Sequence, residues 1–350
     1  MNLAVSGAAA DVASARPLAL SLGDPAGVGP ELAAEAWARR EEEGLPAFFA
    51  CGGAELLAEA ARRRGLDVPI VPITDCAEAA EVFASGIPVL AGADALYRPG
   101  EPDEQGARFA IASLELASAL AVNGQAGAIV TGPIAKSHLA RYGFTQPGQT
   151  EFVADASGTP RDDAVMMLAG PSLRTVPLTV HTALSAVPEL LTVDLIARRV
   201  RVVAAWLERD FGIERPRIAI TGLNPHAGED GRMGTEEQRV IAPAIALLQQ
   251  EGLAVTGPHP ADALFAPRER DAYDVAVCMY HDQALIPIKT LDFDQGVNVT
   301  LGLPIVRTSP DHGTAFGIAG SGRASAGATI AAIHLAGQCA ARRAARLGAG

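Results

Sequence analysis

The sequence predicts an α/β fold with a mostly parallel sheet. Short apolar runs typical of strands alternate along the chain with alanine-rich stretches typical of helices, which is the pattern of βαβ units. Hydrophobic residues make up 49% of the 350 residues and aromatic residues only 5%, a composition that suits helices packed closely on a sheet. Because this length exceeds that of a typical single domain, we expect two lobes or one large α/β unit.

The first part of the chain contains four expected strands. A glycine-rich loop follows the first of them, and Pro30 marks the start of the helix after that loop. Pro69 and Pro72 cannot donate hydrogen bonds to a neighbouring strand, so we expect the third strand at a sheet edge. The expected strands are 18–22, 48–51, 68–73 and 128–131, and the expected helices begin at residues 31, 55 and 107.

The middle of the chain has four further strand-like runs, each of which leads into a polar turn. These turns carry nearly all the side chains that could take part in chemistry. In open α/β sheets ligands bind outside the carboxyl ends of the strands, so a site is expected at this position. The four runs are 165–168, 175–180, 217–221 and 275–279.

Charge and composition exclude several classes of protein. The formal net charge of −12 repels a phosphate backbone, and the basic run 342–346 is typical of a last helical turn, so we expect no nucleic-acid partner. No run reaches the roughly 18 apolar residues of a membrane span. Four cysteines lie far apart without metal-binding spacing, which indicates a reducing compartment and predicts a cytoplasmic protein. Residues 1–17 are expected to form a loose leader.

Three histidines stand just after expected strands: His181, His226 and His281. Imidazole is a common ligand of zinc-like ions, and three protein ligands leave positions open for substrate. A single histidine in this setting is more often hydrogen-bonded to a loop, but three in similar settings favour a divalent metal site. Polar neighbours could orient two of the rings through their second nitrogen. They are Asn224, Glu229 and Asp230 beside His226, and Asp282 and Gln283 beside His281.

The other histidines are weaker candidates. His138 and His334 are expected to be structural residues of helices, and His259 lies in an expected proline-flanked loop. His312 follows Asp311 at an expected helix start, where either helix capping or anion binding would explain the sequence.

A second group of candidates consists of Lys289, Asn298 and Arg307. Lysine supplies a point charge and arginine a planar fork, so together they suit a phosphate or carboxylate. A salt bridge from Lys289 to Asp292 or Asp294 is an equally good interpretation of the sequence alone.

The loop GDPAGVGPE at residues 23–31 is a poor match to a dinucleotide-binding motif. It lacks the third glycine of that motif, and the second expected strand leads directly into Gly52 without the acidic residue that would bind a ribose. A nicotinamide cofactor would have to bind in another way.

Seven motifs between about residue 18 and the C-terminus resemble the 4-hydroxythreonine-4-phosphate dehydrogenase family of vitamin B6 synthesis. The length and order of these motifs make chance agreement negligible. They are LSLGDPAGVGPE, TGPIAKSHL, TEFVA, GLNPHAGEDG, GPHPADALF, MYHDQALIPIK and GVNVTLGLPIVRTSPDHGTAFGIAG.

The resemblance implies a two-lobed fold like that of isocitrate and isopropylmalate dehydrogenases, with a mostly parallel sheet in each lobe. Residues 1–145 and 303–350 would form the first lobe, on the cofactor side, and residues 146–302 the middle lobe, with the metal, the substrate and the dimer interface. It also implies a homodimer with the active site at the interface.

The resemblance assigns roles to individual residues. His181, His226 and His281 would bind one zinc, magnesium or cobalt ion across the dimer, and Lys289, Asn298 and Arg307 would bind substrate together with Thr150. Asp262 would be a further active-site acid, and the catalytic group would comprise Asp262 and His281. The general base is either Asp262 or a metal-bound water.

One position departs from the family pattern. The family motif usually reads Gly-His-Thr-Glu, whereas this chain has Gln149 ahead of Thr150, and an amide cannot carry charge or move a proton. We expect Gln149 to contact substrate.

The resemblance implies oxidation of 4-phosphohydroxy-L-threonine with NAD or NADP, followed by decarboxylation to 3-amino-2-oxopropyl phosphate, in pyridoxine 5′-phosphate synthesis. The alternative, which Gln149 motivates, is the oxidation of a carboxylated cis-dihydrodiol in terephthalate-type aromatic breakdown. A non-catalytic binding protein would be expected to have lost some of these side chains, and all are present.

Overall fold

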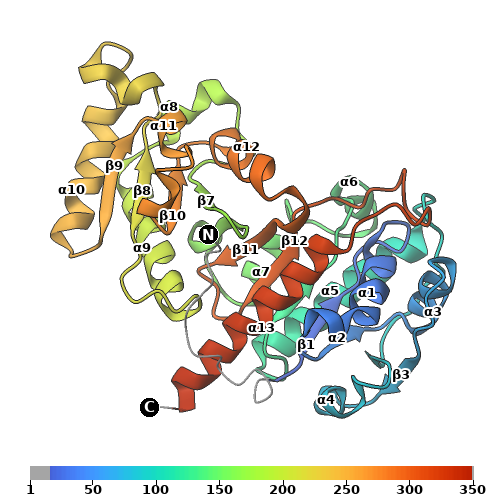
Figure 1. The fold of residues 1–350 in the computed structure, drawn as a ribbon. Helices are drawn as coiled ribbons and strands as arrows, with labels where there is room; N and C mark the ends of the chain where they lie inside the picture. The colour runs from blue at the N-terminus through green and yellow to red at the C-terminus, as the bar shows by residue number, and fades with distance from the viewer. Residues whose placement is uncertain (1–15, 349–350) are drawn as a thin grey trace. The chain divides into compact units, whose positions relative to one another are not determined.

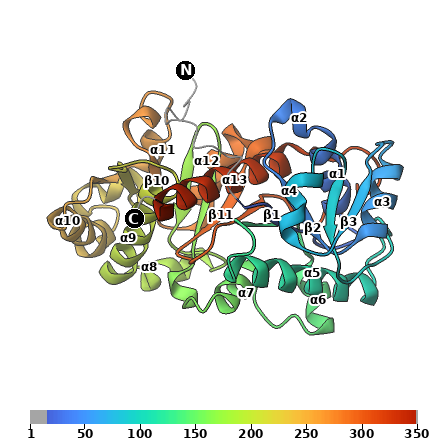
Figure 2. The same ribbon diagram turned by 90° about the horizontal axis from the view of Figure 1, so that it is seen from below.

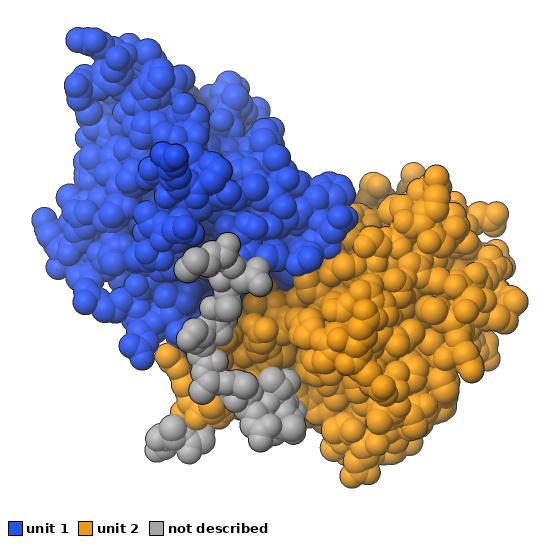
Figure 3. Space-filling view, in the orientation of Figure 1, with its two compact units in different colours: residues 1–7, 162–302 blue, residues 8–161, 303–350 orange. Residues whose placement is uncertain are grey.

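The computed structural model describes residues 16–348, so most of the expected leader lies outside the described residues. The described chain forms two compact units (Figure 3). Unit 1 comprises residues 162–302, and unit 2 comprises residues 16–161 and 303–348. Residues 146–161, which the sequence analysis assigned to the middle lobe, belong to unit 2, because α7 (Gln149–Ala156) packs against α5 (Glu104–Val122). None of the described helices is both long and apolar enough to cross a membrane.

Unit 2 contains, within the described residues, six strands that pair in parallel throughout. The third predicted strand lies at the edge, as Pro69 and Pro72 indicated, and β1 lies inside the sheet between β2 and β5. All four residues of β1 are buried, which is typical of a strand covered on both faces. In spatial order the strands are β3 (Ile70–Ile73), β4 (Ile87–Leu90), β2 (Phe48–Cys51), β1 (Leu18–Ser21), β5 (Ile129–Thr131) and β12 (Arg307–Pro310).

Helices cover both faces of the unit 2 sheet. Figure 2 shows α5 on one face and α13 with α1 on the other, and α1 also packs against α3. Helix α5 begins three residues earlier than predicted, because the Asp103 side chain accepts a hydrogen bond from the Gly106 backbone N–H at 2.7 Å and caps the helix. The remaining helices are α1 (Gly29–Ala38), α2 (Arg40–Glu43), α3 (Ala54–Arg63), α4 (Ala79–Val82), α6 (Lys136–Leu139) and α13 (Gly327–Gly348).

Unit 1 contains a mixed sheet of six strands within the described residues (Figure 1). Strand β6 is antiparallel to both of its neighbours, whereas β7, β10, β8 and β9 are parallel to one another. In spatial order the strands are β11 (Val297–Leu301), β6 (Val165–Ala169), β7 (Arg174–Pro177), β10 (Val275–Cys278), β8 (Ile218–Thr221) and β9 (Val255–His259). The helices are α8 (Val187–Leu190), α9 (Val193–Arg209), α10 (Ala242–Gln250), α11 (Ala261–Leu264) and α12 (His281–Leu291).

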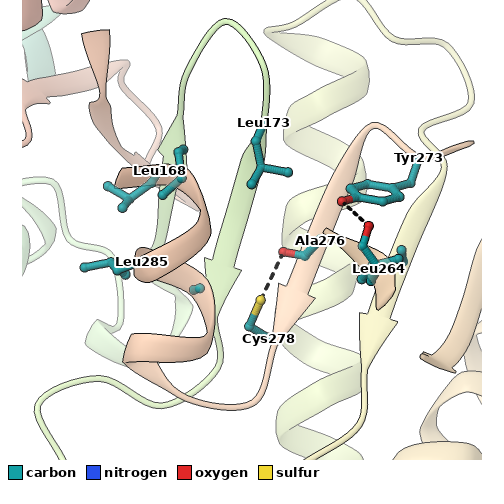
Figure 4. Packing of buried hydrophobic residues seen from close by; sticks show 10 residues of the cluster. Leu168, Leu173, Leu264, Tyr273, Ala276, Cys278 and Leu285 are labelled. Atoms are coloured by element: carbon teal, nitrogen blue, oxygen red, sulfur yellow. Dashed lines mark hydrogen bonds between the residues drawn. The ribbon is translucent and has the colours of Figure 1, made fainter. Parts of the chain in front are cut away.

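A buried apolar cluster joins α11 and α12 to the sheet of unit 1 (Figure 4). Leu285 of α12 and Leu264 of α11 belong to it, together with Ala276 of β10. The Tyr273 hydroxyl donates a hydrogen bond to the Leu264 carbonyl oxygen at 3.2 Å, so the polar tip of this buried ring is satisfied. Because packed cores resist displacement, the two helices hold fixed positions over the strands.

The loop after β1 contains Gly23, where close packing of the backbone can be tested by substitution. Gly23 has φ +74°, and a Cβ added there would lie 2.3 Å from the Pro133 carbonyl oxygen, whereas Gly44 has φ +61° and nothing within 4 Å of such a Cβ. Gly44→Ala should lower the free energy of unfolding by about 1–2 kcal/mol through its left-handed backbone. Gly23→Ala should lower it by about 2–5 kcal/mol, because the steric clash is added. Urea denaturation measures the free energy of unfolding of both variants. Equal losses would show that the steric clash with Pro133 does not constrain Gly23.

Candidate active site

Four candidate residues follow the carboxyl ends of four neighbouring parallel strands of unit 1. In the order of the sheet, β7 leads to His181, β10 to His281, β8 to His226 and β9 to Asp262. Because the strands are parallel and neighbours in a sheet are about 4.8 Å apart, these loops leave the sheet at one edge. That edge is where open α/β sheets bind ligands.

His181 and His281 lie close together. Their ring centroids are 6.0 Å apart, with an angle of 38° between the ring planes. Both rings line a pocket of about 290 Å³. The other lining residues are Thr182, Leu184, Val187, Tyr280 and Asp282. Two imidazoles therefore face one small open cavity.

The His281 ring is oriented by its neighbour in the chain. Its Nδ1 lies 2.7 Å from Asp282 Oδ1, so a proton on Nδ1 leaves Nε2 as the unprotonated nitrogen that can bind a metal. Gln283, the other expected orienting residue, does not have this role. It accepts hydrogen bonds from Met279 N–H and the Thr221 hydroxyl and donates one to the Gly222 carbonyl oxygen. Gln283 thus joins the ends of β8 and β10.

His226 lies in an unusual turn. Residues 226–230 all have positive φ, and four of these five residues are not glycine. A left-handed backbone costs about 1–2 kcal/mol for each such residue, so the turn is strained. Asn224, which was expected to orient the imidazole, instead donates to the side chains of Glu236 and Glu237.

The donor set fits a divalent metal in its chemistry. His181 and His281 offer two imidazole nitrogens to one pocket, and a carboxylate on His281 Nδ1 is the usual partner of a metal-binding histidine. Among residues 16–348 no group of three or more histidine, cysteine or acidic side chains is arranged so that it could hold a metal ion. The binding of His226 to the same ion therefore stays a prediction.

Asp262 occupies the first turn of the short helix α11. Its side chain is exposed, and α11 packs against the turn that contains His226. The acid and this histidine thus come from adjacent elements beyond β9 and β8.

Arg307 is a buried cation in unit 2. Its side chain is only 3% exposed, and its Nη2 donates to Thr131 Oγ1 at 2.8 Å and to Gln149 Oε1 at 2.9 Å. Its Nη1 lies 3.4 Å from Thr150 Oγ1. Burial lowers the pKa of Arg307 to about 10, which leaves the guanidinium charged at neutral pH. Sequence reasoning did not single out Thr131, for which the end of a predicted strand was the only signal.

Both polar atoms of the Gln149 amide are engaged inside unit 2. Its oxygen accepts from Arg307, and its Nε2 donates to the Gly132 carbonyl oxygen at 2.8 Å. The side chain is 8% exposed. Gln149 therefore orients Arg307, and its expected contact with substrate stays a prediction.

Lys289 and Asn298 belong to unit 1. Lys289 is half-buried in the last turn of α12, and Asn298 lies on β11 opposite Leu168 of β6. The Asn298 Oδ1 atom is buried and has no hydrogen-bond partner among the described residues. A buried acceptor of this kind is suited to a donor on a ligand.

Two of the weaker histidine predictions were wrong. No helix starts at His312, because residues 311–326 form turns and the next helix begins at Gly327. His259 is not in a loop but ends β9, where its Nε2 lies 2.8 Å from Thr256 Oγ1. His138 lies in α6 and His334 in α13, as predicted.

Comparison with known proteins identifies the family. Residues 45–336 match the model of the family described as pyridoxal phosphate biosynthetic protein PdxA. The chain belongs to this family. The resemblance inferred from the seven motifs is thereby confirmed.

Relatives extend the match to nearly the whole of this chain. It is 62% identical over 329 residues to a 4-hydroxythreonine-4-phosphate dehydrogenase of Erythrobacter litoralis, covering 94% of this chain and 98% of the relative. The crystal structure of a Klebsiella pneumoniae protein with the same name superposes with a TM-score of 0.82 at 37% identity, covering 93% of this chain and 98% of that one. A terephthalate 1,2-cis-dihydrodiol dehydrogenase of Burkholderia xenovorans LB400 gives a TM-score of 0.64 at 29% identity, covering 92% and 98%.

The contact between Gln149 and Arg307 predicts a difference between two variants. Gln149→Leu removes an acceptor from a buried cation and should lower the free energy of unfolding by about 1–3 kcal/mol. Gln149→His can still accept from Arg307 and donate to Gly132 as a neutral ring, so its loss should be less than about 1 kcal/mol. Urea denaturation compares them, and equal stability of the two variants would show that the amide does not support Arg307.

Proposed function

We propose that this member of the PdxA family is an NAD(P)- and divalent-metal-dependent 4-hydroxythreonine-4-phosphate dehydrogenase of pyridoxine 5′-phosphate synthesis. It would oxidise 4-phosphohydroxy-L-threonine to a β-keto acid, which then loses carbon dioxide to give 3-amino-2-oxopropyl phosphate. The observation that carries the proposal is the placement of three histidines and Asp262 after four neighbouring parallel strands, in a chain 62% identical to a relative with this name.

In this proposal His181 and His281 bind one divalent metal ion, and His226 is the third ligand. The ion is zinc, magnesium or cobalt. When bound, the metal would supply a Lewis acid that polarises the oxygen atoms of the substrate. The hydrogen bond to Asp282 orients the His281 ring so that, with the proton of the neutral ring on Nδ1, Nε2 faces the metal. Asp262 is exposed and adjacent to the His226 turn, which suits it to accept the hydroxyl proton.

The anionic groups of the substrate require cations. We assign them to Lys289 and Arg307, with Asn298, Thr150 and Gln149 as polar contacts. The Arg307 guanidinium donates hydrogen bonds to the neutral side chains of Thr131 and Gln149, and a guanidinium is well suited to bind an anionic group of the substrate. The buried, unpaired Oδ1 of Asn298 can accept a hydrogen bond from a substrate N–H or O–H group.

We propose a homodimer in which the two subunits share the metal site. His181 and His281 of one subunit would be completed by His226 of the partner subunit. Exposed large apolar side chains that follow the first two histidines support such an interface, since Leu184 is 63% and Ile286 of α12 is 64% exposed. We also propose a cytoplasmic location, because all four cysteines are free thiols.

The function is tested by a steady-state assay with 4-phosphohydroxy-L-threonine and either NAD or NADP. Reduction of the cofactor should be lost after thorough treatment with a chelator and restored by zinc, magnesium or cobalt, because the imidazoles act through the metal. His281→Ala should lower kcat/KM at least about 100-fold. Full turnover after chelation would contradict the metal-dependent reaction.

Gln149 favours testing a second substrate, a cis-dihydrodiol that bears carboxylates. The terephthalate dihydrodiol dehydrogenase that this chain resembles is less similar than the relative named for the phosphate ester, at 29% against 62% identity. We therefore expect kcat/KM to be higher for the phosphate ester in both the wild type and Gln149→His. A higher value for the dihydrodiol would favour the second function.

Sharing of the metal site between subunits predicts complementation. Homodimers of His226→Ala and of His281→Ala each lack a ligand in both sites, but a mixed dimer has one intact site. Unfolding and refolding an equal mixture should restore about one quarter of the wild-type activity, because half of the dimers are mixed and each has one working site. Mixing His181→Ala with His281→Ala is the matched control and should restore none. Equal recovery from both mixtures would contradict the arrangement.

A further inference from the structure

Glu237 is a buried carboxylate beside the His226 turn. It begins the π-helical segment η7 (Glu237–Ile241), and only 4% of its surface is exposed. A buried carboxylate is unfavourable unless hydrogen bonds satisfy it. The arrangement around Glu237 therefore indicates which groups it holds.

The carboxylate binds the segment that leads from β8 into the turn. Its Oε1 accepts hydrogen bonds from the backbone N–H groups of Leu223 at 2.9 Å and Asn224 at 2.8 Å. Its Oε2 accepts one from Asn224 Nδ2 at 3.0 Å. Three hydrogen bonds to a charged group fix the backbone two residues before His226.

The same carboxylate lies against the other side of the turn. A Cβ added to Gly228 would lie 2.6 Å from Glu237 Oε2, and one added to Gly222 would lie 3.1 Å from Oε1. The backbone thus approaches the carboxylate closely both before and after His226. Glu237 fills the inside of the turn.

The turn needs such support because its backbone is strained. Residues 226–230 have φ between 41° and 80°, a region that residues other than glycine rarely occupy. Strained conformations persist where the surroundings hold them, and they cluster at functional sites. Short π-helical segments such as η7 are likewise frequent at functional sites.

We infer that Glu237 is a positioning residue that holds the left-handed turn in the conformation that presents His226 to the metal. The inference rests on the proposed function, in which His226 is a metal ligand. Glu237 would act through the backbone of the turn, whereas Asp282 acts directly on the ring of His281. Groups behind a metal ligand typically change metal affinity about 10–100-fold when they are removed.

The test compares Glu237→Ala and Glu237→Gln with Glu236→Gln. Glu236 is the matched control, because its Oε2 also accepts from Asn224 Nδ2, at 2.8 Å, but its other hydrogen bond is to Thr235 and not to the segment between β8 and the turn. Glutamine keeps the volume of glutamate and one acceptor oxygen, so Glu237→Gln should fold and should have a smaller effect than alanine.

Two measurements are made on each dimeric, full-length variant. In the metal-free protein, hydrogen exchange of the peptide covering residues 222–234 should be at least about 10-fold faster in the Glu237 variants, because the backbone donors lose a charged acceptor. Zinc affinity, measured by competition with a chelating indicator, should fall about 10–100-fold. Glu236→Gln should stay within about threefold of the wild type in both measurements.

Wild-type exchange in the turn of the Glu237 variants would overturn the inference, and so would wild-type zinc affinity. A loss of affinity in Glu236→Gln equal to that in Glu237→Gln would also overturn it, because charge near the site would then explain the effect. A wild-type protein that binds no zinc would overturn the proposed function instead. In that case the exchange rates of the metal-free variants would still decide whether Glu237 holds the turn.

Discussion

The parallel pairing of β7, β10, β8 and β9 is the constraint on which the candidate metal site depends. Backbone N–H and C=O groups in a buried sheet must be paired, so the register of these strands cannot change without loss of hydrogen bonds. The pairing brings four loops to one edge, but it does not by itself fix the conformations of the loops. Gln283 restricts them further, because its amide joins Thr221 at the end of β8 and Gly222 after it to Met279 after β10.

The two units contain buried charges of opposite sign, a guanidinium in unit 2 and a carboxylate in unit 1. In unit 2 the Arg307 guanidinium donates hydrogen bonds to the neutral side chains of Thr131 and Gln149. In unit 1 the Glu237 carboxylate is held by backbone and amide donors. A neutral partner fixes the geometry of a charge without neutralising it, whereas a buried ion pair would satisfy both charges internally. In the proposed roles, Arg307 would bind an anionic group of the substrate, whereas Glu237 would hold the backbone of the His226 turn.

Of the twelve strands in the described residues, sequence reasoning predicted eight and missed β4, β9, β11 and β12. Residues 18–21, 48–51 and 275–278 were predicted because every residue is apolar or small. Strand β9 was missed because Gly257 and Pro258 interrupt its apolar pattern, and β12 because most of its residues are polar. These strands form through pairing with neighbours distant in the sequence, which local patterns do not reveal.

Contacts between distant segments also limited what the sequence could predict of the candidate active site. The position of each histidine after a strand was predictable, because apolar runs end at recognisable turns. The partners were not, since Thr221 and Gln283 are 62 residues apart and Thr131 and Arg307 are 176 residues apart. Nor could the left-handed turn be predicted, because Ala227 and Glu229 are residue types that normally avoid positive φ.

The distribution of backbone strain argues that the candidate ligands are held for a function. Among the described residues, six that are not glycine have positive φ, and five of the six lie after β7 or β8, His181 and His226 among them. In a loop without a function, each of these residues could adopt negative φ or be substituted by glycine, because loops tolerate such changes. The backbones of His181 and His226 are therefore strained, and the rest of the fold must offset the free-energy cost of this strain. His281 needs no such support, because its ring is oriented from the first turn of a regular helix.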